Sequence, residues 1–217
     1  MVQIPVRFMA VAAISACLPA CHLFHPGSGA TAAVPVKKND TNWRDIATDF
    51  DRGRLRQARA AWNEGLEEAR RTNAADVAAL GPLADPDVAL DNPAPLPGPY
   101  RCRAIKLGSQ SDSTLSFVAY NFFRCTIRPG PNGRLLFDKL DGSQRQHGIF
   151  WPDNRTAMVF IGTISLGDER STIPYGADNQ RNLIGTLNRV GPARWRIALP
   201  RPAWESDIDL VELVPAG

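Results

Sequence analysis

The sequence predicts a mainly β protein with an N-terminal helical segment, in which an antiparallel meander of strands closes into a small barrel. Three observations support this fold class. Helical spacing of apolar residues is confined to the region before residue 80, strand-like segments follow one another from residue 100 onward, and short turn-forming stretches join them. Closure removes the exposed edges that an open sheet would have to protect. A β-sandwich is the alternative that the same pattern allows.

The chain divides into four predicted parts. Residues 1–20 form a signal peptide, 21–40 a flexible linker, 41–98 a helical segment with a proline-rich connector, and 99–217 an antiparallel β domain. The linker is rich in Gly, Ala, Pro and Ser, a composition typical of flexible tethers.

The N-terminal segment has the features of a secretory leader. Arg7 supplies a positive charge, and the apolar run 8–20 has the length of a signal hydrophobic region, shorter than a comfortable membrane span. We therefore expect export, with the protein either in the periplasm or anchored to the membrane and facing the periplasm.

Two consecutive candidate sites for lipidation lie at the end of this run. The stretches "ISAC" and "LPAC" each resemble the bacterial lipobox and end at Cys17 and Cys21. Residue type favours Cys17 as the lipidated cysteine, because Ser15 is a more usual residue in the second position of a lipobox than Pro19.

Cysteine parity favours Cys21. If Cys17 began the mature chain, Cys21 would remain as an unpaired thiol beside Cys102 and Cys125 in an oxidising compartment. We expect lipidation at Cys21 and a lipid anchor in the membrane. Lipidation at Cys17, and ordinary cleavage after Ala32, remain open.

Helical spacing begins after Asn42. Thr48 followed by Asp51 predicts a capping box that starts a second, longer helix. We expect Trp43 and Trp62 to dock the helices against the rest of the protein rather than to stack on a ligand. The charged residues of the opposite face are expected to be solvated: Arg52, Arg56, Arg59, Glu64, Glu67 and Arg70.

Eight strands are expected in the β domain, joined by the turn-forming stretches "RPGPNG", "LDGS", "WPDN" and "VGPA". The predicted strands are 100–107, 115–128, 134–140, 145–151, 157–166, 182–190, 194–199 and 207–214. Charged and apolar residues alternate in the predicted strands 194–199 and 207–214. Arg196 and Asp209 are on the opposite faces of their strands from Ile197 and Leu210, so we expect one buried and one solvated face. A barrel of this size is either filled by its own side chains or holds one small ligand.

Cys102 and Cys125 lie in the first two predicted strands. A hairpin register that sets them opposite each other, and Ile105 opposite Phe122, permits a cross-strand disulfide. Closing a loop of this size contributes about 3 kcal/mol in the chain-entropy picture. Because the spacing is not C-x-x-C, we expect a structural rather than a redox-active bond.

The stretch "KLDGSQRQHG" carries the candidate binding residues Ser143, Gln144 and Arg145. The planar donors of Gln144 and Arg145 suit an anion or a carboxylate. The same stretch holds His147 near Ser143 and Asp141, but hydrolase chemistry is disfavoured because no nucleophile elbow is present and these residues share one hairpin. We expect no catalytic residues.

Composition disfavours several other classes. The net charge is only +3, with Lys and Arg interleaved among Asp and Glu, so we do not expect nucleic-acid binding. The chain contains no G-x-G-x-x-G, no P-loop, no H-E-x-x-H and no C-x-x-C zinc spacing. We expect neither a cofactor nor a metal ion.

Several long words together carry a family resemblance: "NWRDIATDFDRGRLRQARAAW", "PGPYRCRAIKLG", "FFRCTI", "DKLDGSQRQHGIFWPD", "MVFIGTISLGDE", "VGPARWRIALPRP" and "DLVELVP". In this order they resemble a bacterial family of exported proteins known as domain of unknown function 4893. The resemblance implies a small envelope protein with a signal or lipoprotein leader, and it implies no activity. The barrel is calycin-like in outline, an analogy of fold alone because no lipocalin signature is present.

These expectations combine into a functional hypothesis. The favoured reading is a non-enzymatic module of the cell envelope that binds a small ligand or an anion in the barrel. The alternative is an envelope factor that binds another protein, and a hydrolase is the least favoured reading.

Overall fold

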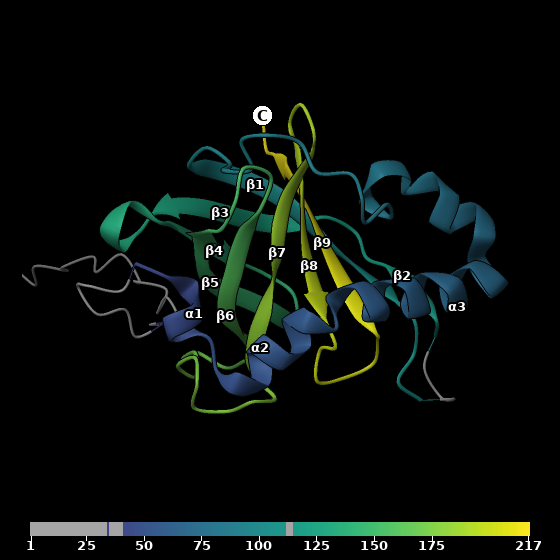
Figure 1. Cartoon of the computed structure of the whole chain (residues 1–217), viewed down its shortest axis with the longest axis horizontal. Helices are drawn as coiled ribbons and strands as arrows, with labels where there is room; N and C mark the ends of the chain where they lie inside the picture. Colours follow the sequence, from purple (N-terminus) through teal and green to yellow (C-terminus); the bar gives the residue numbers. More distant parts are fainter. Residues whose placement is uncertain (1–33, 35–40, 112–114) are drawn as a thin grey trace, which may run out of the picture.

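The computed structural model describes residues 34, 41–111 and 115–217 (Figure 1). The predicted signal peptide, both candidate lipidation sites and nearly all of the predicted linker lie outside these residues. The helices are α1 (Trp43–Ile46), α2 (Asp49–Arg56) and α3 (Ala58–Ala79), with short 3-10 helices η1 (Gly81–Leu83) and η2 (Pro131–Gly133). Among the described helices, none has the length and apolar character needed to cross a membrane.

The strands confirm the predicted fold class. They are β1 (Gly98–Leu107), β2 (Phe117–Ala119), β3 (Phe123–Pro129), β4 (Leu135–Lys139), β5 (Gln144–Pro152), β6 (Met158–Leu166), β7 (Asn182–Gly191), β8 (Arg194–Pro200) and β9 (Ile208–Pro215). From β3 to β9 each strand pairs antiparallel with the next, and β1 pairs with both β3 and β9. The result is a closed eight-stranded barrel to which β2 adds one strand.

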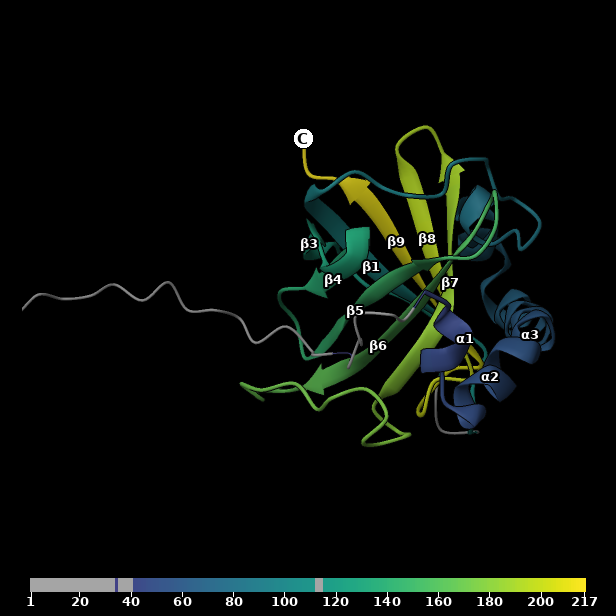
Figure 2. The same ribbon diagram turned by 60° about the vertical axis from the view of Figure 1, so that its left-hand side comes forward.

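The predicted cap and the docking of the helices are confirmed, but the single longer helix expected after Thr48 is divided at Gln57 into α2 and α3. The Thr48 hydroxyl accepts a hydrogen bond from the Asp51 amide at 3.1 Å, which caps α2. Trp62 is buried and donates its indole N–H to the Ala84 carbonyl at 3.1 Å, and Trp43 donates to Asp153 at 2.7 Å. Both tryptophans therefore attach helices to the body. Figure 2 shows all three helices on one side of the barrel.

The barrel interior is packed over most of its length. Aromatic side chains fill its middle, with the ring centroids of Phe150 and Phe160 5.5 Å apart and those of Phe137 and Phe160 6.0 Å apart. The same buried cluster includes Tyr100 and Trp195. Side chains fill this part of the interior, so a ligand inside the barrel would lie toward one of its ends.

The expectation of a solvated outer face on the last strands is wrong. Ile208 and Leu210 belong to the buried cluster that contains the apolar face of α3, whereas Asp209 lies among interior residues and is buried. Arg196 is also buried, beneath the proline-rich connector. Because α3 and the connector cover this wall, both of its faces are buried, and alternation alone could not show which face pointed inward.

The predicted strand 115–128 is divided into β2 and β3 by a bulge. Ile105 pairs with Ala119 and Cys102 pairs with Phe123, so residues 103–104 of β1 lie opposite the three residues 120–122 between β2 and β3. Those three include Tyr120 and are exposed on the surface. One extra residue therefore interrupts the ladder, as in a β-bulge.

The disulfide is present, but the predicted register is wrong. Cys102 and Cys125 are bonded, with their Cα atoms 5.9 Å apart. Tyr100, not Cys102, lies directly opposite Cys125, so the bond joins diagonal neighbours on the inner face.

Candidate functional site at the barrel mouth

One end of the barrel, here called the mouth, has a polar interior. It is the end where β1, β4, β6 and β8 finish and where β3, β5, β7 and β9 begin. Lys106, Gln146 and Asp209 come from three different strands and are buried there. Side chains alternate between the two faces of a strand, and all three of these residues lie on the inward face. Lys106 shares that face with Cys102, Gln146 with Phe150, and Asp209 with apolar core residues.

Two adjoining cavities lie at the mouth. The inner one is a partly enclosed space of about 20 Å³, lined by Lys106, Gln144, Gln146, Ile164, Gln180, Leu183, Leu199, Pro202, Ala203, Trp204 and Asp209. The outer one has about 170 Å³ and is lined by Lys106, Leu115, Val118, Tyr120, Glu205 and Ser206. Lys106 lines both cavities, so it stands between a polar interior and a partly apolar entrance.

The charge of Lys106 is neutralised inside the protein. Its Nζ lies 3.2 Å from Asp209 Oδ2 and 3.0 Å from Glu205 Oε2. Burial disfavours the charged ammonium, but these two carboxylates outweigh that effect and raise the pKa of Lys106 above its usual value. The Ser206 hydroxyl also donates to Asp209. Lys106 is therefore a charged donor that is already paired with anions.

Gln146, in contrast to Lys106, has a side-chain atom without a partner in the described part of the chain. Its side chain lines the inner cavity and is 3% exposed, yet its amide oxygen has no hydrogen-bond partner among the described residues. A buried acceptor without a partner costs about 1–3 kcal/mol, and such groups are uncommon in folded proteins. This oxygen is a ready acceptor for a hydroxyl or N–H group.

The β8–β9 loop, residues 201–207, covers the mouth under backbone strain. Arg201 and Glu205 have φ values of +46° and +74°, in the left-handed region that non-glycine residues rarely adopt. The Gln110 amide nitrogen holds the loop by donating to the carbonyls of Pro202 at 2.7 Å and Ser206 at 2.6 Å. Strain of this kind persists where surrounding contacts enforce it, and it is concentrated at functional sites.

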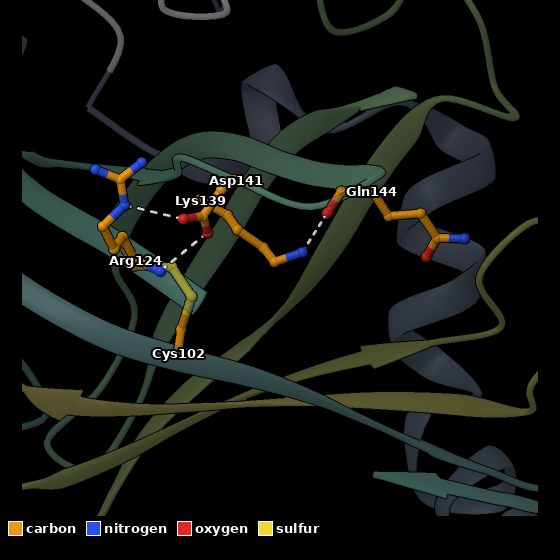
Figure 3. Close-up of a disulfide and its surroundings, with 6 residues drawn as sticks. Cys102, Arg124, Lys139, Asp141 and Gln144 are labelled. Atoms are coloured by element: carbon orange, nitrogen blue, oxygen red, sulfur yellow. Dashed lines mark hydrogen bonds and ion pairs between the residues drawn. A yellow bond between two sulfur atoms is a disulfide. The ribbon is translucent and has the colours of Figure 1, made fainter. Parts of the chain in front are cut away.

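A second buried lysine, Lys139, lies beside the disulfide (Figure 3). Its Nζ donates to the Gln144 carbonyl at 2.6 Å and lies 4.0 Å from the centre of the Phe123 ring. No carboxylate in the described part of the chain is within ion-pair distance of it. Burial lowers the pKa of Lys139 to about 8, so near neutral pH it is a weakly held cation.

The structure separates the three predicted binding residues. Gln144 lines the inner cavity, whereas Ser143 is exposed in the β4–β5 turn. The Arg145 guanidinium donates to the backbone carbonyls of Gly142 at 2.9 Å, Gly167 at 2.5 Å and Glu169 at 2.9 Å. Since its donors hold two loops, Arg145 has a structural role.

The residues considered for hydrolase chemistry are not brought together. His147 Nδ1 is 3.0 Å from Asp138 Oδ1, and Asp141 pairs instead with Arg124 at 2.9 Å. Ser143 lies four residues before His147, about 13 Å away along an extended chain. Within the described residues, moreover, no group of three or more His, Cys, Asp or Glu side chains is arranged to hold a metal ion.

Sequence reasoning missed Lys106, Gln146 and Asp209. The signal was present as polar residues at inward positions of strands whose neighbouring inward positions are apolar. Once Cys102 is assigned to the interior, the period of two places Lys106 there as well. The disulfide pair was thus the available marker of the inner face.

These features define a class: a closed antiparallel β-barrel, flanked by helices, with a packed interior and a small polar cavity at one end. The chain belongs to the family described as Domain of unknown function (DUF4893), which matches residues 43–213. No curated protein and no solved structure matches the chain.

Proposed function

We propose that this protein is a non-enzymatic binding protein for a small, uncharged ligand that carries hydroxyl groups, held at the barrel mouth. The observation that carries the proposal is the buried amide oxygen of Gln146, which lines a cavity and has no hydrogen-bond partner in the part of the chain that the structure describes. A ligand hydroxyl would satisfy this acceptor, while Lys106 and Gln144 supply donors nearby.

The charge pattern favours an uncharged ligand over an anion. Lys106 is already paired with Asp209 and Glu205, and Arg145 is bound to backbone carbonyls. An anion would have to compete with two carboxylates for the ammonium group, which costs electrostatic free energy. A hydroxyl group can donate to Gln146 and accept from Lys106 without breaking the ion pairs.

The cavity also limits the size of the ligand. The outer space of about 170 Å³ is smaller than the roughly 300–1,000 Å³ of pockets that bind drug-sized molecules. Its lining combines Leu115, Val118 and Tyr120 with polar groups. This mixture suits a polyol or a single sugar ring in the outer cavity, since such a ligand presents both C–H faces and hydroxyl groups. One hydroxyl group would reach past Lys106 into the inner cavity of about 20 Å³, where Gln146 lies.

The test is calorimetric titration with a panel of polyols and monosaccharides, with small carboxylates and phosphate as the comparison group. We expect at least one hydroxyl ligand to bind and Gln146→Leu to abolish that binding. The same substitution removes an unsatisfied buried acceptor, so the variant should be about 1 kcal/mol more stable to urea than the wild type. Gln57→Ala, an exposed glutamine at the start of α3, is the control.

Two results would reject the proposal. One is preferential binding of the anions. The other is undiminished binding of a hydroxyl ligand by a folded Gln146→Leu variant.

We further propose that the protein acts in the cell envelope, anchored through Cys21. The leader sequence and the Cys102–Cys125 disulfide, a bond typical of oxidising compartments, support this location. Intact-mass measurement of the membrane fraction should show a diacylglycerol-modified chain that begins at Cys21. The modification should be lost in Cys21→Ser and kept in Cys17→Ser, and the reverse pattern would assign the anchor to Cys17.

A further inference from the structure

The outer face of β1 and β3 carries four arginines, Arg101, Arg103, Arg124 and Arg128, here called the arginine wall. The main helix contacts of the barrel lie elsewhere, with α2 on β7 and α3 on the mouth half of β1 and on β2, β8 and β9. In Figure 2, β3 lies on the side of the barrel away from α2 and α3.

Two of these arginines face each other. Arg101 of β1 pairs in register with Arg124 of β3, and both are exposed. Like charges directly opposite on neighbouring strands are destabilising, so this pair has a cost in the isolated protein. An external anion placed between the two guanidinium groups would remove that cost.

Positive charge exceeds negative charge on the wall. Arg103 shares Glu212 with Arg194, at 2.5 Å each, so one carboxylate serves two guanidinium groups. Arg124 pairs with Asp141 and Arg128 with Asp138. Within the described residues Arg101 has no carboxylate at ion-pair distance, and its guanidinium carbon lies 5.1 Å from the centre of the Phe122 ring.

Exposed apolar side chains surround the arginines. The bulge between β2 and β3 exposes Tyr120 and Phe122, and the β4–β5 turn exposes Leu140, whose amide bonds to the Arg124 carbonyl at 2.9 Å. Arg103 also lies 5.1 Å from the centre of the Phe122 ring. Aromatic and aliphatic groups among guanidinium groups form the combination that meets a bilayer surface, where rings enter the headgroup layer and cations meet phosphates.

We propose that the arginine wall docks the protein on an anionic phospholipid surface. The excess positive charge specifies the sign of the partner, and Tyr120, Phe122 and Leu140 supply side chains for the interfacial layer. The wall is the convex outside of a barrel, and a fluid layer of headgroups adapts to such a surface without a matching groove. Tyr120 also lines the outer cavity, so docking places the cavity entrance at the membrane surface.

The experiment is vesicle co-sedimentation of the full chain with Cys17 and Cys21 replaced by Ser, so that no acyl anchor contributes. Vesicles of phosphatidylcholine alone are compared with vesicles containing phosphatidylglycerol. We compare Arg101→Glu/Arg124→Glu with a control of equal net charge, Arg56→Glu/Arg70→Glu, which reverses two exposed arginines of α2 and α3. The N-terminal segment is identical in all three proteins.

We expect tenfold or greater preference for anionic vesicles, weakened by salt, and a loss of at least tenfold in the wall variant. The control should change by less than twofold. Phe122→Ala, which keeps all charges, should weaken binding by a smaller factor and guards against misfolding of the charge reversal. Equal binding of the wall and control variants to the anionic vesicles overturns the proposal. It would leave an acidic protein as the partner to seek.

Discussion

Lys106 and Gln146 show that one small volume can hold both a fully paired and an unpaired polar group. The Lys106 ammonium has two carboxylates, whereas the Gln146 oxygen has no partner among the described residues. The first arrangement stabilises the fold and the second leaves binding capacity unused. We therefore assign ligand recognition to Gln146 and its neighbours, and organisation of the mouth to Lys106 and Asp209.

Replacing Lys106 with Met should destabilise the protein strongly. Asp209 would remain buried without its cation, and loss of one member of a buried ion pair costs about 3–5 kcal/mol. Urea unfolding followed by circular dichroism measures the change. The double variant Lys106→Met/Asp209→Leu should recover much of the loss, and failure to recover any would show that the ion pair is not the cause.

Lys139 should make stability depend on pH in the alkaline range. Its pKa is lowered by burial to about 8, whereas an unfolded lysine titrates near 10.5. Between these values the unfolded chain holds a proton that the folded chain has lost, so this group makes stability rise with pH, by up to about 3 kcal/mol. Lys139→Met should lack that rise in urea unfolding measured from pH 7.5 to pH 10.5. Parallel curves for the two proteins would contradict the assignment.

At the scale of elements, Arg196 joins the barrel to the proline-rich connector. Its guanidinium donates to the carbonyls of Pro82 at 3.0 Å and Asp85 at 2.7 Å, and its carbon lies 4.5 Å from the centre of the Trp62 ring. Burial lowers the pKa of Arg196 to about 10, and the nearby Asp85 partly opposes this effect. One side chain thus replaces hydrogen bonds that the connector cannot make within itself.

Arg196→Leu should release the connector. It leaves several buried carbonyls without donors, and we expect a loss of about 2–4 kcal/mol together with new proteolytic cleavage within residues 81–97. Limited proteolysis with mass mapping is the measurement, and Arg70→Leu on the solvated face of α3 is the control. Unchanged protection of the connector would contradict this role.

Most elements followed from local sequence signals, and the exceptions have identifiable causes. The cap at Thr48 and most strand positions depend on short-range chemistry and were predicted. The bulge at Tyr120 was not predicted, because aromatic residues are common in strands and the segment therefore resembles one continuous strand. Only the pairing with β1 shows that one residue is extra. Because this extra residue was not predicted, the residue expected opposite Cys102 was also wrong.

The site was less predictable than the fold for a related reason. Gln144 was named from a dense polar turn, and it does line the inner cavity. Arg145 was named for its donors, but pairing of β5 with β6 brings backbone carbonyls to them. Whether a polar side chain is free or used depends on long-range contacts, which a single sequence does not specify.

In the whole molecule, the middle of the barrel is packed with side chains and one end is polar. A disulfide also links two of the barrel strands. Cys102–Cys125 links β1 to β3 next to the bulge, where the ladder of hydrogen bonds is interrupted. The covalent bond therefore reinforces the closed sheet where its ladder is interrupted.

Removing the disulfide should reveal this contribution. In Cys102→Ala/Cys125→Ala the free energy of unfolding should fall by about 3 kcal/mol, mainly because the unfolded chain regains freedom. Urea unfolding of the wild type with and without reductant provides the independent comparison. A loss below about 1 kcal/mol in both would show that this part of the sheet is held by packing alone.

Binding of a small hydroxyl ligand at Gln146 is tested most directly by titrating the isotope-labelled protein and following its two-dimensional NMR spectrum. With the polyol and monosaccharide panel, we predict amide shifts that concentrate at residues 106, 144–146 and 204–206 and that disappear in Gln146→Leu. An absence of shifts with every member of the panel, or shifts centred away from the mouth, would contradict ligand binding at Gln146.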